Sequence, residues 1–153
     1  MTKIFATLGL MMLSDAATAQ HMFLTSVDTD RGTIMAVDTD TIRDVGSYRR
    51  AWVLMGVANS ATQMRSFYAN TLFEYDCVGE RSQRLAGKIY KTSGELMADL
   101  PAESFTYLAP GSNYYTAMRA VCRPEVIKED EVTAQTIQDL FARFLALMAD
   151  KKK

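Results

Sequence analysis

The segment Phe73-Glu-Tyr-Asp-Cys-Val-Gly79 decides the fold, because it places a cysteine at the end of an alternating run of residues. Across residues 65–77, the odd positions carry mainly aromatic and small side chains, whereas most even positions are polar. This period of two is typical of a β-strand with one face toward a core. It predicts that Cys77 shares the buried face with Phe73 and Tyr75.

The first 19 residues show the pattern of a secretory signal peptide. Lys3 supplies a positive charge, residues 4–13 are uncharged and mostly apolar, and Ala17-Thr-Ala19 supplies small residues before a cleavage site. The apolar run is too short for a transmembrane helix, which needs about twenty residues. The alternative is an amphipathic N-terminal helix of the fold. We expect cleavage before Gln20 and an exported protein, either periplasmic, on the cell surface or secreted.

This compartment bears on the role of the two cysteines. In an oxidising space, two cysteines are most simply interpreted as one disulfide. A catalytic or zinc-binding cysteine would need partners, and the only histidine, His21, lies beside the expected new N-terminus. We therefore predict a Cys77–Cys122 disulfide, with a pair of buried free thiols as the alternative. No catalytic residue, metal site or cofactor is predicted.

The remaining pattern predicts an antiparallel sheet followed by two helices. Short turns separate the expected strands, which cover residues 22–27, 33–37, 48–57, 65–77 and 82–92. Trp52, on a strand with apolar residues on both faces, is expected to be largely buried, and residues 94–108 are expected to form a loop. Ser112 is a good N-cap for a helix over residues 113–122, whose apolar stripe includes Cys122. The predicted fold class is α+β, with a helix disulfide-linked to one face of the sheet and a C-terminal amphipathic helix.

The C-terminal helix is expected over residues 130–150. Its apolar stripe contains Ile137, Leu140, Phe141, Phe144, Leu145 and Met148. Such a stripe either packs on the chain's own sheet or first helix, or binds a partner or a second copy of the chain. These six residues are the partner-binding candidates. The expected organisation is a signal peptide at 1–19, a domain at 20–122 and an extension at 123–153.

Charge and carboxylate patterns argue against several functions. The formal net charge of −1, with only a terminal lysine cluster at residues 151–153, predicts no nucleic-acid binding. The acidic pairs Asp38/Asp40 and Glu74/Asp76 are the candidates for a hydrolase. Alternation predicts that the second pair faces solvent, and no set of acid, base and nucleophile can be assembled, so we expect no enzyme. The fragment at residues 28–32 resembles part of a calcium loop but lacks its later ligands; the alternative is a turn capped by its own aspartate.

Taken in order, these segments resemble the surface-adhesin protein E family of exported bacterial proteins. The resemblance is carried by Val37-Asp38 with Ile42, by residues 51–54, 72–77 and 110–112, and by Val121-Cys122. It implies an antiparallel sheet with a helix held to its concave face by the cysteine bridge, and non-enzymatic binding. The name-giving members adhere to host matrix glycoproteins such as vitronectin and laminin. This sequence departs from them by lacking a lipid-anchor cysteine and by adding residues 123–153.

Two functions follow from these expectations. The first is an exported, non-enzymatic binding protein that adheres to host matrix or cell-envelope proteins. The alternative is a periplasmic accessory protein that acts through self-association, for example as a homodimer, or through an envelope partner.

Overall fold

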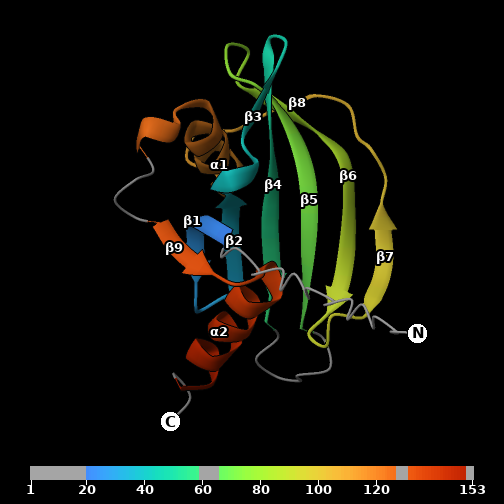
Figure 1. The fold of residues 1–153 in the computed structure, drawn as a ribbon, viewed down its shortest axis with the longest axis vertical. Coiled ribbons are helices and arrows are strands. Elements are labelled where there is room, and N and C mark those ends of the chain that lie inside the picture. The colour runs from blue at the N-terminus through green and yellow to red at the C-terminus, as the bar shows by residue number, and fades with distance from the viewer. Residues whose placement is uncertain (1–19, 59–65, 127–130, 151–153) are drawn as a thin grey trace, which may run out of the picture.

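The computed structural model describes residues 20–58, 66–126 and 131–150. The expected signal peptide lies outside these residues. The elements follow one another along the chain as β1 (Gln20–Asp28), β2 (Thr33–Asp38), the 3-10 turn η1 (Thr39–Thr41), β3 (Arg43–Val45), β4 (Tyr48–Val57), β5 (Phe67–Asp76), β6 (Arg81–Lys91), β7 (Leu96–Leu100), β8 (Thr106–Tyr107), α1 (Asn113–Cys122), η3 (Pro124–Val126), β9 (Glu131–Ala134) and α2 (Ile137–Asp150) (Figure 1).

All nine described strands join one sheet. The strand order is β7-β6-β5-β4-β2-β1-β9, while β3 pairs with β4 and β8 pairs with β6. Every pairing is antiparallel. The predicted α+β architecture, with an antiparallel sheet and two helices, is confirmed.

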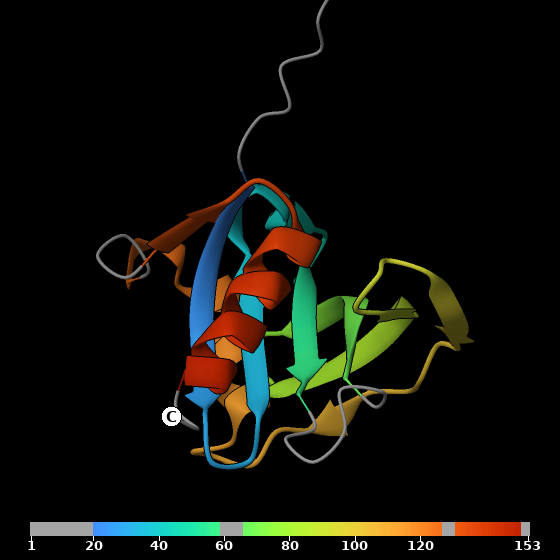
Figure 2. The same ribbon diagram turned by 90° about the horizontal axis from the view of Figure 1, so that it is seen from below.

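The two helices cover opposite faces of the sheet. Figure 2 shows α2 lying across β1, β2 and β4, with α1 on the other side of these strands. Leu54 on β4 packs in the cluster that contains α2, whereas its neighbour Val53 packs in the cluster that contains α1. Successive side chains of β4 point to opposite faces of the sheet and therefore pack in two separate cores, which explains why β4 is apolar on both faces.

The two elements with the strongest local sequence signals were predicted with the correct bounds. β4 spans the predicted residues 48–57, and α1 spans the predicted 113–122. The hydroxyl of Ser112 accepts a hydrogen bond from the backbone N–H of Tyr115 at 3.2 Å, as an N-cap does. Trp52 differs from the expectation, because it is only half-buried. It shares the face of Leu54, but it belongs to neither buried cluster.

Two weakly patterned segments turn out to be strands. The expected loop at 94–108 contains β7 and β8, and both pair with β6. The expected helix at 130–150 begins only at Ile137, because residues 131–134 pair with β1 as strand β9. The hydroxyl of Thr136 accepts from the N–H of Asp139 at 3.0 Å and marks the true start of the helix. Pairing with β6 at the first place and with the distant β1 at the second overrides local propensity.

Candidate binding surface at the disulfide-linked end

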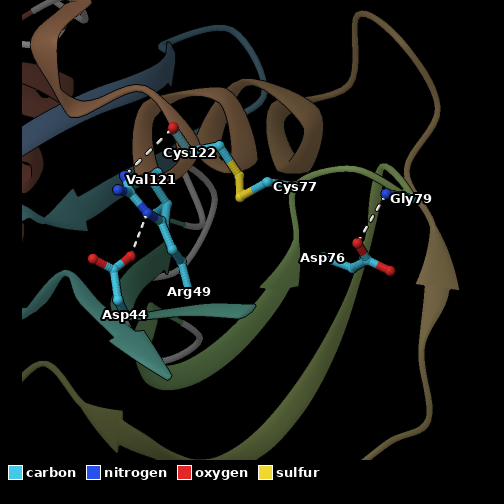
Figure 3. The surroundings of a disulfide bond; sticks show 7 residues. All are labelled: Asp44, Arg49, Asp76, Cys77, Gly79, Val121 and Cys122. Carbon is cyan, nitrogen blue, oxygen red and sulfur yellow. Dashed lines mark hydrogen bonds and ion pairs between the residues drawn. A yellow bond between two sulfur atoms is a disulfide. The ribbon is translucent and has the colours of Figure 1, made fainter. Parts of the chain in front are cut away.

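The disulfide joins α1 to the end of β5. Cys77 follows the last residue of β5, Cys122 is the last residue of α1, and their Cα atoms lie 5.7 Å apart (Figure 3). The predicted disulfide is confirmed, and the free-thiol alternative is wrong. The bond fixes the C-terminus of the helix to the turn between β5 and β6.

The carboxylate of Asp76 stabilises the turn between β5 and β6. Asp76 accepts from the backbone N–H of Gly79 at 2.8 Å and from the Nε of Arg81 at 2.8 Å. These two donors hold the pKa of Asp76 below its ordinary value, the backbone N–H being the larger cause. Asp76 is therefore a structural acceptor that closes the turn.

Arg49 makes a second attachment between the sheet and the helix. Its Nη1 donates to the carbonyl oxygens of Val121 at 2.9 Å and Cys122 at 3.4 Å, and its Nε donates to Asp44 at 2.7 Å. The carbonyls at a helix C-terminus carry partial negative charge and lack intrahelical donors. Figure 3 shows this guanidinium group beside the disulfide.

Aromatic side chains complete the same end of the sheet. The ring of Phe105 lies 5.3 Å from that of Tyr48, and the guanidinium carbon of Arg81 lies 5.0 Å from the Phe105 centroid. On the helix side, the hydroxyl of Tyr115 donates to Glu80 at 2.9 Å, and this bond raises the pKa of Tyr115.

Two apolar side chains project from this rigid frame. Val78 is 94% exposed in the β5–β6 turn, and Tyr107 on β8 is 77% exposed. Tyr107 lies opposite Arg81 in the sheet, and the N–H of Leu108 donates to the carbonyl of Glu80 at 3.0 Å. We call the surface formed by Val78, Glu80, Tyr107 and Tyr115 the disulfide-end surface.

Sequence reasoning did not find this surface. Val78 was assigned to a turn, which is correct, but nothing in the local pattern shows how far its side chain projects. Tyr107 fell in the segment expected to be a loop. One signal could have indicated the surface. Val78 and Tyr107 are large apolar residues in segments rich in turn residues, and these segments lie close in sequence to Cys77 and to the helix that carries Cys122.

The predicted partner-binding residues lie elsewhere. Leu140, Phe141, Phe144 and Met148 are buried in the cluster beneath α2, and Ile137 and Leu145 pack against it half-buried. The apolar stripe of α2 thus packs on the chain's own sheet, which was one of the two expected arrangements. The large apolar residue that α2 does expose is Leu147, at 52%.

The carboxylate pairs form salt bridges and turns. Glu74 was expected to face solvent but is only 5% exposed, because Arg50 and Gln83 contact its two oxygens at 2.8 and 2.7 Å.

Asp28 accepts from the N–H groups of Asp30 and Arg31 at 3.0 and 2.8 Å, which is the capped turn given as the alternative to calcium binding.

The described residues form neither a metal-binding cluster nor a membrane-spanning helix. Within them, no three His, Cys, Asp or Glu side chains are arranged to hold a metal ion. Nor does any helix in the same part of the chain have the length and apolarity to cross a membrane.

An antiparallel sheet with a helix disulfide-linked to one face is the architecture that the resemblance to surface-adhesin protein E implied. The family model described as surface-adhesin protein E matches residues 24–123. The chain therefore belongs to this family and is an adhesin-like protein. The match ends one residue after Cys122 and leaves β9 and α2 outside it. No curated protein and no solved structure matches the chain.

Proposed function

We propose that this protein is exported and that it adheres to host matrix or cell-envelope proteins, without catalysis, through the disulfide-end surface. The observation that carries the proposal is the exposure of Val78 and Tyr107 on a frame fixed by the Cys77–Cys122 bond and by Arg49. Exposed apolar and aromatic side chains on a rigid support gain contact area on binding and lose little conformational entropy. Glu80 and Tyr115 supply polar groups around them.

The test measures binding of the purified protein to immobilised matrix glycoproteins, with vitronectin and laminin as probes, and to envelope extract. Val78→Asp and Tyr107→Ala should each weaken binding about tenfold, which corresponds to roughly 1.4 kcal/mol. Leu147→Asp is the matched control, because Leu147 is an exposed apolar residue on α2. Equal loss with all three variants, or no loss with the first two, would contradict the assignment of the surface. Fractionation of cells separates a surface-exposed pool, which adhesion requires, from a periplasmic one.

The alternative, a periplasmic accessory protein that associates with itself, is favoured by one feature of the sheet. β7 is the last strand in the order, and it exposes Leu96 at 47% and Met97 at 53%. An exposed apolar edge strand is a template for pairing with another strand. If this edge joins two copies, Met97→Lys should abolish dimers in sedimentation experiments. A wild-type protein that is monomeric at all concentrations tested would exclude the homodimer.

A further inference from the structure

The segment that runs along the outer edge of β6 buries almost no side chain. Residues 96–103, which include β7 (Figure 1), are all exposed except Leu100, which is half-buried. Leu100 lies over Gly87 of β6, where a Cβ atom would be 3.1 Å from the Leu100 side chain. Burial of apolar surface is the main favourable term in folding, so it contributes little to holding this segment in place. We call residues 96–103 the β7 segment.

The chain is fixed on either side of the β7 segment. Before it, the turn between β6 and β7 is closed by Lys91, whose N–H donates to the carbonyl of Glu95 at 2.8 Å. Gly94 in this turn has a φ of 85°, a conformation that glycine adopts readily. After the segment, the half-buried ring of Phe105 lies 5.3 Å from that of Tyr48. The β7 segment can therefore separate from β6 while the residues before and after it stay attached.

The backbone pairing between β7 and β6 is short and interrupted. Leu100, Asp99 and Ala98 lie opposite consecutive residues of β6. The register then shifts, so that Leu96 lies opposite Tyr90 and Met97 has no residue opposite it. A bulge of this kind disrupts the hydrogen-bond ladder locally. The segment beyond β7 adds one backbone bond, from the N–H of Glu103 to β6 at 2.8 Å.

Charges of opposite sign face each other across this edge. The ammonium of Lys88 donates to Asp99 at 2.8 Å, and the guanidinium of Arg84 pairs with Glu103. The two carboxylates are 73% and 61% exposed. The Nε of Arg84 also donates to the carbonyl of Pro101 at 2.7 Å. The β7 segment contains no lysine or arginine, so in both pairs the cation belongs to β6 and the carboxylate to the segment.

We propose that the β7 segment opens from β6 as a separate unit while the rest of the sheet stays paired, and that its two ion pairs make this opening increase with ionic strength. Salt screens exposed charges, since the Debye length falls from about 30 Å at 0.01 M to about 3 Å at 1 M. Opening uncovers the backbone N–H and C=O groups at the edge of β6, which can then pair with another extended segment. The proposal is independent of the disulfide-end surface, because Val78 and Tyr107 lie outside the β7 segment.

The experiment follows hydrogen exchange of single backbone amides by NMR in the purified protein. The β7 amides that pair with β6 should exchange at least about tenfold faster than β4 amides, after division by their intrinsic rates, and low denaturant should not accelerate them. Raising NaCl from about 0.01 M to about 1 M should accelerate the β7 amides at least about twofold. β7 amides that exchange as slowly as β4 amides, or with the same dependence on denaturant, would overturn separate opening. Exchange that does not respond to salt would overturn the control by the ion pairs.

Charge variants separate the effect of the ion pairs from damage to the fold. At low salt, Asp99→Asn should accelerate the β7 amides by about 1.4- to fivefold, the range for losing one exposed ion pair, and should weaken their response to salt. The double variant Lys88→Glu with Asp99→Lys keeps opposite charges at the two positions and should restore the wild-type rate. Arg143→Gln is the matched control, because it breaks an ion pair on α2 and should leave the β7 amides unchanged. A double variant that exchanges as fast as Asp99→Asn, or an equal effect of Arg143→Gln, would contradict the proposal.

Discussion

The guanidinium group of Arg49 donates to the carbonyl oxygen of Val121 at 2.9 Å, one residue before the cysteine that ties α1 to the sheet. The C-terminus of α1 is thus attached twice, once covalently to the end of β5 and once by a charged hydrogen bond to β4. The two attachments lie side by side (Figure 3) and together fix the helix beside the turn that carries Val78.

Replacing Arg49 tests the non-covalent attachment. Arg49→Met keeps most of the aliphatic length but leaves the helix carbonyls without their donor and Asp44 without its partner. Since the side chain is 28% exposed, we expect a loss of about 1–2 kcal/mol in the free energy of unfolding, measured with denaturant. Lys88→Met is the matched control, because Lys88 forms a more exposed ion pair with Asp99 and should cost less than about 1 kcal/mol. Equal costs would show that the contact with Val121 contributes nothing.

The covalent attachment should dominate the stability of this end. Cys77→Ser should lower the free energy of unfolding by about 2–5 kcal/mol, because the bond closes a long loop in the unfolded chain. The two cysteines are separated by 45 residues in sequence. The double variant with Cys122→Ser should resemble the single variants, since both lose the same bond. Thiol labelling of unreduced wild-type protein should find no free thiol, and two reactive thiols would contradict the disulfide.

Among the described residues, Phe141 is the largest fully buried side chain of the second core, beneath α2. Phe141 is 1% exposed, and its ring lies 5.4 Å from that of Tyr68. Phe141→Ala should cost about 3–5 kcal/mol, the range for deleting a buried aromatic side chain. Leu147→Ala, on the exposed side of the same helix, should change stability by less than about 0.5 kcal/mol. Truncation after Pro124 should abolish cooperative unfolding, and a truncated protein with an unchanged melting curve would show that α2 is dispensable.

A glycine on β4 lets α2 approach the sheet. A Cβ atom on Gly56 would lie 2.5 Å from the ring of Phe141 and 2.7 Å from Ile34, which is closer than such contacts allow. Gly56→Ala should therefore destabilise the protein by about 1–3 kcal/mol through overpacking. Combining it with Phe141→Leu should cost less than the sum of the two single changes, because the smaller side chain makes room. Full additivity would mean that the two residues do not compete for space.

The success of sequence reasoning depended on whether the deciding interactions were local. The strand that carries Trp52 and the helix capped by Ser112 were predicted with correct bounds, because their periodicity and capping lie within a few residues. β9 was missed because residues 131–134 are extended only through pairing with the distant start of β1. The exposure of Val78 and Tyr107 and the burial of Asp38 and Glu74 depend on neighbours that are remote in sequence, so no local pattern could reveal them.

The pH dependence of stability should report the burial of Asp38, which is 2% exposed. The pKa of this carboxyl is about 6 in the folded protein against 3.8 as its ordinary value, so the folded state binds the proton more tightly than the unfolded chain does. The contribution of Asp38 is therefore fully present below pH 4 and is lost as the pH rises to about 6, by roughly 1–3 kcal/mol. Asp40 and Asp76 have lowered pKa values, so their contributions run in the opposite direction and are lost as the pH falls.

Subtracting the pH profile of Asp38→Asn from that of the wild-type protein isolates the effect of Asp38. The difference should show wild-type protein losing stability relative to the variant between pH 4 and 6. A flat difference across this range would mean that Asp38 is ionised as easily in the fold as in the unfolded chain.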